Sequence, residues 1–211
     1  MRITILVDNP DSWFVPYAKL LRDLLTDESH IVSLVHEHSN IISGDVLFIL
    51  SCEKLINSFQ LSKHTNNIVI HPSDLPKGRG WSPLAWQVLE GNNRIAITLF
   101  EAKDGVDSGP VYFKETIKLT GLEINSELKE LQGSKTISMA LKYIRNFSKM
   151  VAKPQSGPVT YYKRRGKDSN VLDVNKPIID QFNILRISDN ERYPAHFYIG
   201  GQKYNIKIEK E

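Results

Sequence analysis

Short apolar runs alternate with amphipathic segments along the first hundred residues. Four of these runs are bounded by polar or turn-forming residues and predict buried strands, at residues 2–7, 30–35, 44–50 and 67–70. Apolar residues recur at helical spacing over 12–25, and 83–90 has a proline in its first turn with Gly91 beyond its end. Strands that alternate with helices pair in parallel through right-handed crossovers. The pattern therefore predicts an α/β fold, a Rossmann-like, mostly parallel sheet with flanking helices.

The pattern continues with less regular elements. Residues 94–100 predict another strand, and 110–119 alternate apolar and polar positions, as expected of an antiparallel or edge strand with one wet face. Residues 51–54 are expected to begin a short helix. Helical spacing also extends over 124–151, with a predicted interruption near Gly133.

A Pro/Gly/Ser/Lys-rich segment divides the chain. We expect a main catalytic domain over 1–151, a linker over 152–159 and a small β-rich C-terminal subdomain over 160–211. Within the subdomain, a β-rich run over 193–199, followed by two glycines and a second run over 202–208, predicts a hairpin. A subdomain of this size is marginally stable alone, so it should pack on the main domain or on another subunit.

Composition narrows the classes of protein. The chain has 211 residues, 41% hydrophobic and 24% charged, which is ordinary for a soluble globular protein. A net charge of +3 and a pI near 8.8 suit anionic small molecules but are too weak to indicate nucleic acid. No apolar run approaches the ~20 residues that span a bilayer, and a single cysteine excludes an internal disulfide or a cysteine-based metal cluster. We therefore expect a cytoplasmic protein with no membrane partner and no metal.

The loop after the fourth strand is the first candidate site. His71 ends the strand, and the next twelve residues contain three prolines and two glycines, which favour an ordered, irregular loop before a helix. Ligands of open α/β sheets bind at the carboxyl ends of the strands, so this imidazole is well placed. Nothing after the first strand matches the Gly-x-Gly-x-x-Gly fingerprint, which argues against a dinucleotide site.

A second polar loop, residues 101–109, carries Asp104 and Asp107 and leaves a strand that could neighbour the first. A carboxylate beside an imidazole fixes its tautomer and favours its protonated form, so the two groups can move a proton. This is a proton-transfer pair, because Cys52 and the loop serines lack the context of an activated nucleophile. A structural ion pair is the alternative.

Two motifs carry a resemblance to a known family. They are His71-Pro72-Ser73-x-Leu75-Pro76-x-x-x-Gly80-x-Ser82-Pro83, followed by Trp86 and Gly91, and Val106-Asp107-Ser108-Gly109-Pro110-Val111, whose aspartate stands thirty-six residues after His71. Over roughly residues 40–120 the chain resembles the folate-dependent formyltransferases, which include glycinamide ribonucleotide, methionyl-tRNA and nucleotide-linked amino-sugar N-formyltransferases. The resemblance implies transfer of a formyl group from N10-formyltetrahydrofolate to a primary amine, with His71 and Asp107 as catalytic residues.

The chain departs from the family at one position. The family pattern is Asn-x-His, and Val69 stands where the asparagine is expected. That amide donates a hydrogen bond to the formyl oxygen as charge develops, and losing such a donor costs on the order of a hundredfold in rate. Asn67 is about 13 Å from His71 along an extended strand, too far to replace it. The candidate replacements are protonated His71, a backbone N–H, Ser73 and Ser51.

The resemblance also implies binding residues. The folate would lie between two segments, contributed by Leu50, Ser51 and Cys52 and by Glu101, Asp104, Gly105 and Val106. The acceptor would contact Ser73, Lys77, Arg79, Gly80, Ser82 and Arg165, with the cations suited to a diphosphate. The alternative is a solvated acidic loop for the carboxylates and solvated surface cations for the basic residues.

The expected acceptor is a nucleotide-linked amino sugar, because Tyr162, Arg165, Asp168 and 186–195 resemble the C-terminal regions of those enzymes. The tail is only locally basic, so nucleic acid is not an expected partner. Another small amine, as in the glycinamide ribonucleotide enzymes, is one alternative. A non-catalytic binder of folate or sugar nucleotide, motivated by Val69, is the other. Family members are often dimers, which makes a homodimer an expected assembly.

Overall fold

A computed structural model describes residues 1–211, except for the side chain of Lys167. Its centre is a six-stranded sheet in the order β2-β1-β3-β4-β6-β7. The strands are β1 (Arg2–Leu6), β2 (Ile31–Val35), β3 (Gly44–Ile49), β4 (His64–His71), β6 (Arg94–Glu101) and β7 (Val111–Lys118). The first four pair in parallel, whereas β6 pairs antiparallel with both β4 and β7. The predicted mostly parallel Rossmann-like sheet is confirmed, and so is the antiparallel edge strand.

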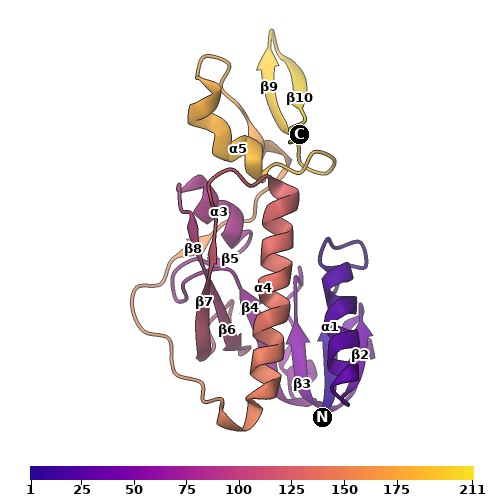
Figure 1. The fold of residues 1–211 in the computed structure, drawn as a ribbon. Helices are drawn as coiled ribbons and strands as arrows, with labels where there is room; N and C mark the ends of the chain where they lie inside the picture. The colour runs from indigo at the N-terminus through magenta and orange to yellow at the C-terminus, as the bar shows by residue number, and fades with distance from the viewer.

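Helices cover the sheet unevenly. The helices α1 (Val15–Asp27) and α4 (Asn125–Arg145) pack against each other, and Figure 1 shows them side by side along one face of the sheet. Apolar side chains of alternate strand positions, such as Ile3 and Ile5, enter the core on this side, while Leu6 and Leu47 enter a smaller core on the other. The short helices α2 (Ser58–Leu61) and α3 (Pro83–Leu89) lie near the carboxyl ends of the parallel strands. No helix in the described part of the chain combines the length and apolar character needed to cross a membrane.

Two local predictions were wrong. The helix α4 runs through Gly133 without interruption. A Cβ at this position would lie 2.5 Å from ring carbons of Tyr17, which explains why the residue is glycine. The glycine therefore serves the close approach of α1 and α4 and does not end a helix. Residues 51–54 form a turn and not a helix. Ser51 has a φ of +53°, and the backbone N–H groups of the next loop residues, Glu53 and Lys54, donate to the carboxylate of Asp8.

The C-terminal subdomain contains α5 (Phe182–Ile187) and the hairpin β9 (Ala195–Ile199) and β10 (Gln202–Ile206), around a small apolar cluster. The predicted hairpin is confirmed. The remaining elements are β5 (Arg79–Gly80), which pairs with β8 (Tyr161–Tyr162), and the 3-10 turns η1 (His38–Asn40), η2 (Phe147–Lys149), η3 (Lys167–Asn170) and η4 (Ile178–Gln181). Figure 1 shows the subdomain above the end of the sheet, at the first turn of α4.

A buried ion pair fixes the subdomain to the main domain. The guanidinium of Arg186, 2% exposed, lies 3.2 Å from the carboxylate of Glu123 and also donates to the carbonyl of Gly121. Burial raises the pKa of Glu123, but hydrogen bonds from Thr120 and from the Gly121 N–H outweigh that effect and lower the pKa from 4.5 to about 2. The ionised carboxylate therefore contributes to folding.

Acid should remove this contribution. Because the folded-state pKa of Glu123 lies below its unfolded value, the stabilisation is complete above pH ~5 and is lost as the pH falls toward 2. The free energy of unfolding of the wild type should fall by about 3 kcal/mol more over that range than that of Glu123→Gln. Urea denaturation at a series of pH values measures the difference, and parallel pH profiles would contradict it.

Candidate active site

A cavity of about 530 Å³ crosses the carboxyl ends of the parallel strands. It is lined by the segments that follow β1, β3, β4, β5 and β6, by one side of α4, and by the C-terminal subdomain. The chain leaves β1 toward β2 on one side and returns to β3 on the other, so the cavity lies over the topological switch point. Its volume is in the range that holds a small organic molecule.

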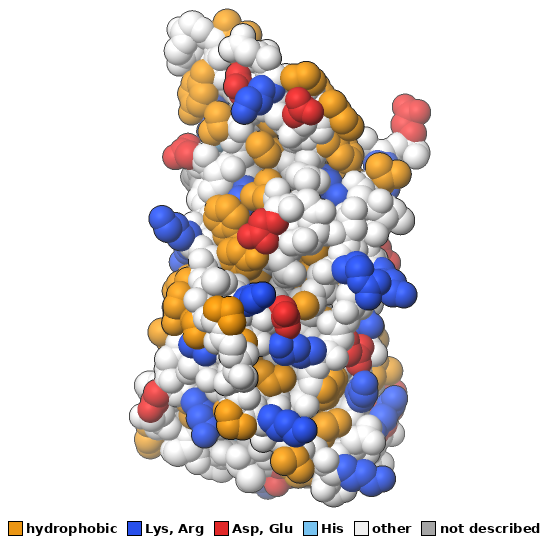
Figure 2. Space-filling model, turned by 90° about the vertical axis from the view of Figure 1, so that its left-hand side faces the viewer, with side chains coloured by type: hydrophobic (Ala, Val, Ile, Leu, Met, Phe, Trp, Pro, Cys, Tyr) orange, Lys and Arg blue, Asp and Glu red, His pale blue; other side chains and the backbone are white. Residues whose placement is uncertain are grey.

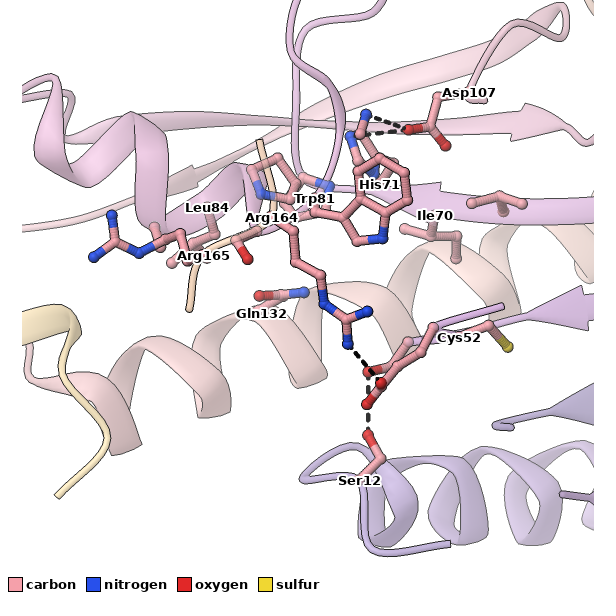
Figure 3. A pocket seen from close by; sticks show the side chains of 18 of the residues that line it. Ser12, Cys52, Ile70, His71, Trp81, Leu84, Asp107, Gln132, Arg164 and Arg165 are labelled. Carbon is pink, nitrogen blue, oxygen red and sulfur yellow. Dashed lines mark hydrogen bonds and ion pairs between the residues drawn. The ribbon is translucent and has the colours of Figure 1, made fainter. Parts of the chain in front are cut away.

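His71 lies at the wall of this cavity. It is the last residue of β4, and its Nε2 lies 2.9 Å from the carbonyl of Gly78 and 3.6 Å from Oδ2 of Asp107 (Figure 3). A carbonyl oxygen only accepts, so Nε2 of the neutral ring carries the proton. Nδ1 makes no hydrogen bond to any described residue. It is therefore the nitrogen that can accept a proton from a bound molecule.

Asp107 reaches His71 by a tight return of the chain after β6. Because β4 and β6 are antiparallel, Glu101 at the end of β6 lies opposite Ile68, three residues before His71. The loop after β6 must therefore reverse direction to bring Asp107 to His71. A Cβ at Gly109 would lie 1.7 Å from the carbonyl oxygen of Glu101, so only glycine permits this return. Asp107 itself has a φ of +48°, and its Oδ2 accepts a 2.8 Å hydrogen bond from the N–H of Gly80.

Val69 lines the cavity on the same wall as His71. Asn67 does not, because its Nδ2 donates to the carbonyl of Leu61 at 3.1 Å. Ser73 is buried with its Oγ unpaired, and it also lies outside the lining. The hydroxyl of Ser51 is at the cavity and shares a 3.1 Å hydrogen bond with Ser12. Of the candidate side-chain donors, the structure therefore brings Ser51 and His71 to the cavity.

The predicted folate residues divide into two groups. Ser51, Cys52, Gly105 and Val106 line the cavity. Leu50, Glu101 and Asp104 do not: the first is buried in the sheet core, and the last lies at a separate shallow depression. The structure therefore places four of the seven predicted folate residues at the cavity and these three outside its lining.

Glu101 has a structural role beside the site. Its carboxylate accepts from the N–H of Asn67 at 2.5 Å and from the hydroxyl of Tyr112 at 2.7 Å. Burial, with the hydrogen bond to this carboxylate, raises the pKa of Tyr112 to about 12. Burial likewise raises the pKa of the Cys52 thiol to about 12, so this cysteine is not a nucleophile at neutral pH.

The predicted acceptor residues also divide. Gly80, Ser82 and Arg165 line the cavity, whereas Ser73, Lys77 and Arg79 lie outside it. The Arg79 guanidinium donates to Gln155 at 2.7 Å, and the Lys77 side chain points to solvent. The structure therefore does not bring Lys77 and Arg79 to the cavity, and their expected contact with a diphosphate stays a prediction.

Arg165 is held within the cavity wall. Its guanidinium stacks 5.2 Å over the ring of Trp86 and donates to Asn170 at 2.5 Å, and burial lowers its pKa. The indole of Trp86 in turn stacks on Tyr162. Of the two tryptophans near the loop, only Trp81 lines the cavity, with its ring beside His71 in Figure 3.

Lys103, within the predicted loop 101–109, lines this cavity. Four further cations that the sequence interpretation missed also line it, namely Lys54, Lys129, Arg164 and Arg192. Figure 3 shows the Arg164 side chain reaching across the cavity, where it pairs with Glu53 at 2.8 Å. Arg192 donates to the carbonyl of Asp11 at 2.6 Å. The basic run 163–167 was a signal for Arg164. The other cations come from distant elements, and no local pattern marks them.

The fold and the site together define a class: a Rossmann-like α/β protein with a proton-transfer pair on a cavity that has one cationic wall. Within the described residues, no cluster of His, Cys, Asp and Glu could hold a metal ion. The family model described as "Formyl transferase" matches residues 15–135, which is more than half of the chain. The chain therefore belongs to the formyl transferase family.

Relatives and solved structures agree with this assignment. A methionyl-tRNA formyltransferase of Mycoplasma capricolum is 30% identical over 149 residues, 69% of this chain and 47% of the relative. The chain spans about half the length of the curated relatives it matches.

Three solved structures show the same fold. A methionyl-tRNA formyltransferase from Clostridium thermocellum superposes with a TM-score of 0.84 at 17% identity, covering 100% of this chain and 93% of that one. A sugar N-formyltransferase from Shewanella sp. has a TM-score of 0.75 at 16% identity, with 100% and 98% covered. HypX from Aquifex aeolicus, solved with tetrahydrofolic acid, has a TM-score of 0.82 at 20% identity, with 99% and 37% covered.

Proposed function

We propose that this chain transfers a formyl group from N10-formyltetrahydrofolate to the primary amine of a nucleotide-linked amino sugar. The observation that carries the proposal is the His71–Asp107 pair, which opens on a cavity with a cationic far wall. Family membership supports formyl transfer, and a structural relative of the same fold has been solved with tetrahydrofolic acid. Sugar N-formyltransferases are among the proteins of this fold.

The cavity offers a fitting place for the folate. Ile49, Leu61 and Val69 form an apolar wall, and the hydroxyl of Ser51 lies at the cavity with them. Lys103, Gly105 and Val106 of the loop after β6 also line the cavity. A flat heterocycle with polar edges fits an apolar slot whose rim offers backbone groups. When bound, the folate would supply an activated formyl group.

His71 and Asp107 would handle the proton of the acceptor. As the amine attacks the formyl carbon, Nδ1 of His71 takes the proton that the amine nitrogen loses. The nearby carboxylate, 3.6 Å from Nε2, stabilises the resulting imidazolium. His71 then returns the proton to the nitrogen that leaves the formyl carbon. One C–N bond forms and one breaks, and the histidine ends neutral.

The cationic wall suits the other end of the acceptor. Arg164 and Arg165 come from the subdomain side, and Lys54 comes from the loop after β3. Guanidinium groups bind phosphate oxygens bidentately, and Arg164 could exchange its exposed partner Glu53 for a phosphate at small cost. This wall takes the role that Lys77 and Arg79 were expected to fill.

Methionyl-tRNA is the second candidate acceptor, favoured by the names of the curated relatives. Nucleic acid binding needs a continuous basic footprint. On the face shown in Figure 2, Lys and Arg side chains lie scattered among acidic and apolar ones, without a basic stripe. The cavity volume of about 530 Å³ is that of a small-molecule site, which favours a small acceptor.

Loss of either member of the pair should abolish turnover. His71→Asn and Asp107→Ala remove the proton acceptor and its counter-charge, so kcat should fall by at least about a hundredfold while the fold persists. Mass spectrometry of the formylated product measures this with N10-formyltetrahydrofolate and a panel of amino-sugar nucleotides. Initiator methionyl-tRNA and glycinamide ribonucleotide serve as competing acceptors.

Two results would contradict the proposal. Near-normal rates in either variant would refute the assigned roles. Folate binding without turnover of any acceptor by the wild type would favour a non-catalytic binder.

The position of Val69 offers a gain-of-function test. Val69→Asn places an amide donor on the cavity wall beside His71, so kcat for the best acceptor should rise about tenfold or more. Val69→Leu, whose side chain resembles that of asparagine in shape but has no donor, is the control and should not raise kcat. An unchanged kcat in Val69→Asn would mean that another group already stabilises the formyl oxygen.

A further inference from the structure

We infer that Gln155 is a positioning residue that holds the two loops of the His71–Asp107 pair together. This inference rests on the proposed function. Gln155 lies in the segment expected to be a linker, does not line the cavity, and carries no charge. It therefore acts on the pair through geometry alone.

The segment around Gln155 is attached to the main domain along its length. Figure 1 shows the chain after α4 passing outside β6 and β7 before it reaches β8. Lys153 and Val111 exchange backbone hydrogen bonds of 2.7 and 2.8 Å, which places the segment at the start of β7. Residues 152–160 thus form a strap bound beside the start of β7 and not a free spacer.

The side-chain amide of Gln155 joins both loops. Its Nε2 donates to the backbone carbonyls of Asp107 and Gly109, each at 2.8 Å. Its Oε1 accepts from the guanidinium of Arg79 at 2.7 Å. Two donors and one acceptor are thereby used, two on the aspartate loop and one on the histidine loop.

The strap continues to the groups that hold His71. The Oγ1 of Thr160 accepts from the N–H of Gly78 at 2.8 Å, and its carbonyl accepts from the N–H of Arg79 at 3.0 Å. The carbonyl of Gly78 is the acceptor of His71 Nε2. A Cβ at Gly80 would lie 2.5 Å from the carbonyl oxygen of Tyr162, so this contact requires glycine. One strap therefore fixes the partner of each catalytic side chain.

Asp107 needs such support more than most residues. Its left-handed backbone, with a φ of +48°, is costly for an aspartate and persists only where surrounding contacts impose it. Its carboxylate is placed by the Gly80 N–H alone among described hydrogen bonds. Without the amide of Gln155, the loop can relax and the carboxylate can leave Nε2.

The kinetic test uses Gln155→Met, which keeps the side-chain length and removes all three hydrogen bonds. Its kcat should fall about tenfold or more, because small misplacements of catalytic groups cost up to about a hundredfold. KM for both substrates should change less than twofold, since Gln155 lines no part of the cavity. Gln155→Glu keeps the bond to Arg79 but places a carboxylate beside the carbonyls of Asp107 and Gly109. Its kcat should therefore fall as much as that of Gln155→Met. The matched control is Gln202→Met, at an exposed hairpin position.

A double-mutant cycle separates positioning from general stability. Arg79→Met should lower kcat less than Gln155→Met does. The double variant should have a kcat no lower than that of Gln155→Met alone, because both residues act through one hydrogen-bond network. A Gln155→Met variant with wild-type kcat would overturn the inference. So would a loss of activity that equals the loss of folded protein in a thermal melt.

A crystal structure tests the positioning role of Gln155 even if no acceptor is ever formylated. In a crystal structure of Gln155→Met, the distance from Asp107 Oδ2 to His71 Nε2 should exceed the 3.6 Å of the wild type by about 1 Å or more. An unchanged distance would overturn the positioning role, whereas wild-type inactivity with a lengthened distance would overturn only the proposed function.

Discussion

The carboxylate of Asp107 lies beside His71 only because the chain reverses tightly after β6. Antiparallel pairing of β4 and β6 carries the end of β6 below the histidine, so a loop must bring the aspartate back. Gly109 permits the reversal by packing its Cα against the carbonyl of Glu101. The carboxylate of Glu101 then closes the base of the same loop by accepting from the N–H of Asn67. The proximity of His71 and Asp107 is therefore a product of sheet topology and not of neighbouring sequence.

The second constraint comes from the end of the chain. Residues beyond α4 return to the site twice, first as the strap around Gln155 and Thr160 and then as the cationic wall around Arg164 and Arg165. The strap holds the loops that position His71 and Asp107, and the cationic wall shapes the place where an anionic acceptor would bind. The subdomain is held against α4 by the buried pair of Arg186 and Glu123, so the cavity depends on contacts far from the reacting groups.

The sequence was informative where a local pattern carries the structure. Periodicity located the strands and most helices. The loop motifs located His71 and Asp107, because the residues that determine a turn are adjacent in the sequence. It misled at Gly133, where a tertiary contact with Tyr17 and not a helix end explains the glycine. It placed Arg79 in the site and overlooked Gln155, since the direction of a side chain in an irregular loop depends on partners distant in the chain. Val69, two positions before His71 in β4, lines the cavity as strand alternation requires of residues on one face.

We infer that the free His71 ring keeps its proton on Nε2, toward Gly78 and Asp107, and would offer Nδ1 to the acceptor amine. Long-range ¹H–¹⁵N correlation NMR of the histidine rings, recorded near pH 8 where an ordinary imidazole is neutral, reports the tautomer directly. We expect a protonated Nε2 and an unprotonated Nδ1 for His71 in the wild type, and the same tautomer in Asp107→Ala, because the carbonyl of Gly78 still accepts from Nε2. A ring that carries its proton on Nδ1 would contradict the proposed direction of proton transfer.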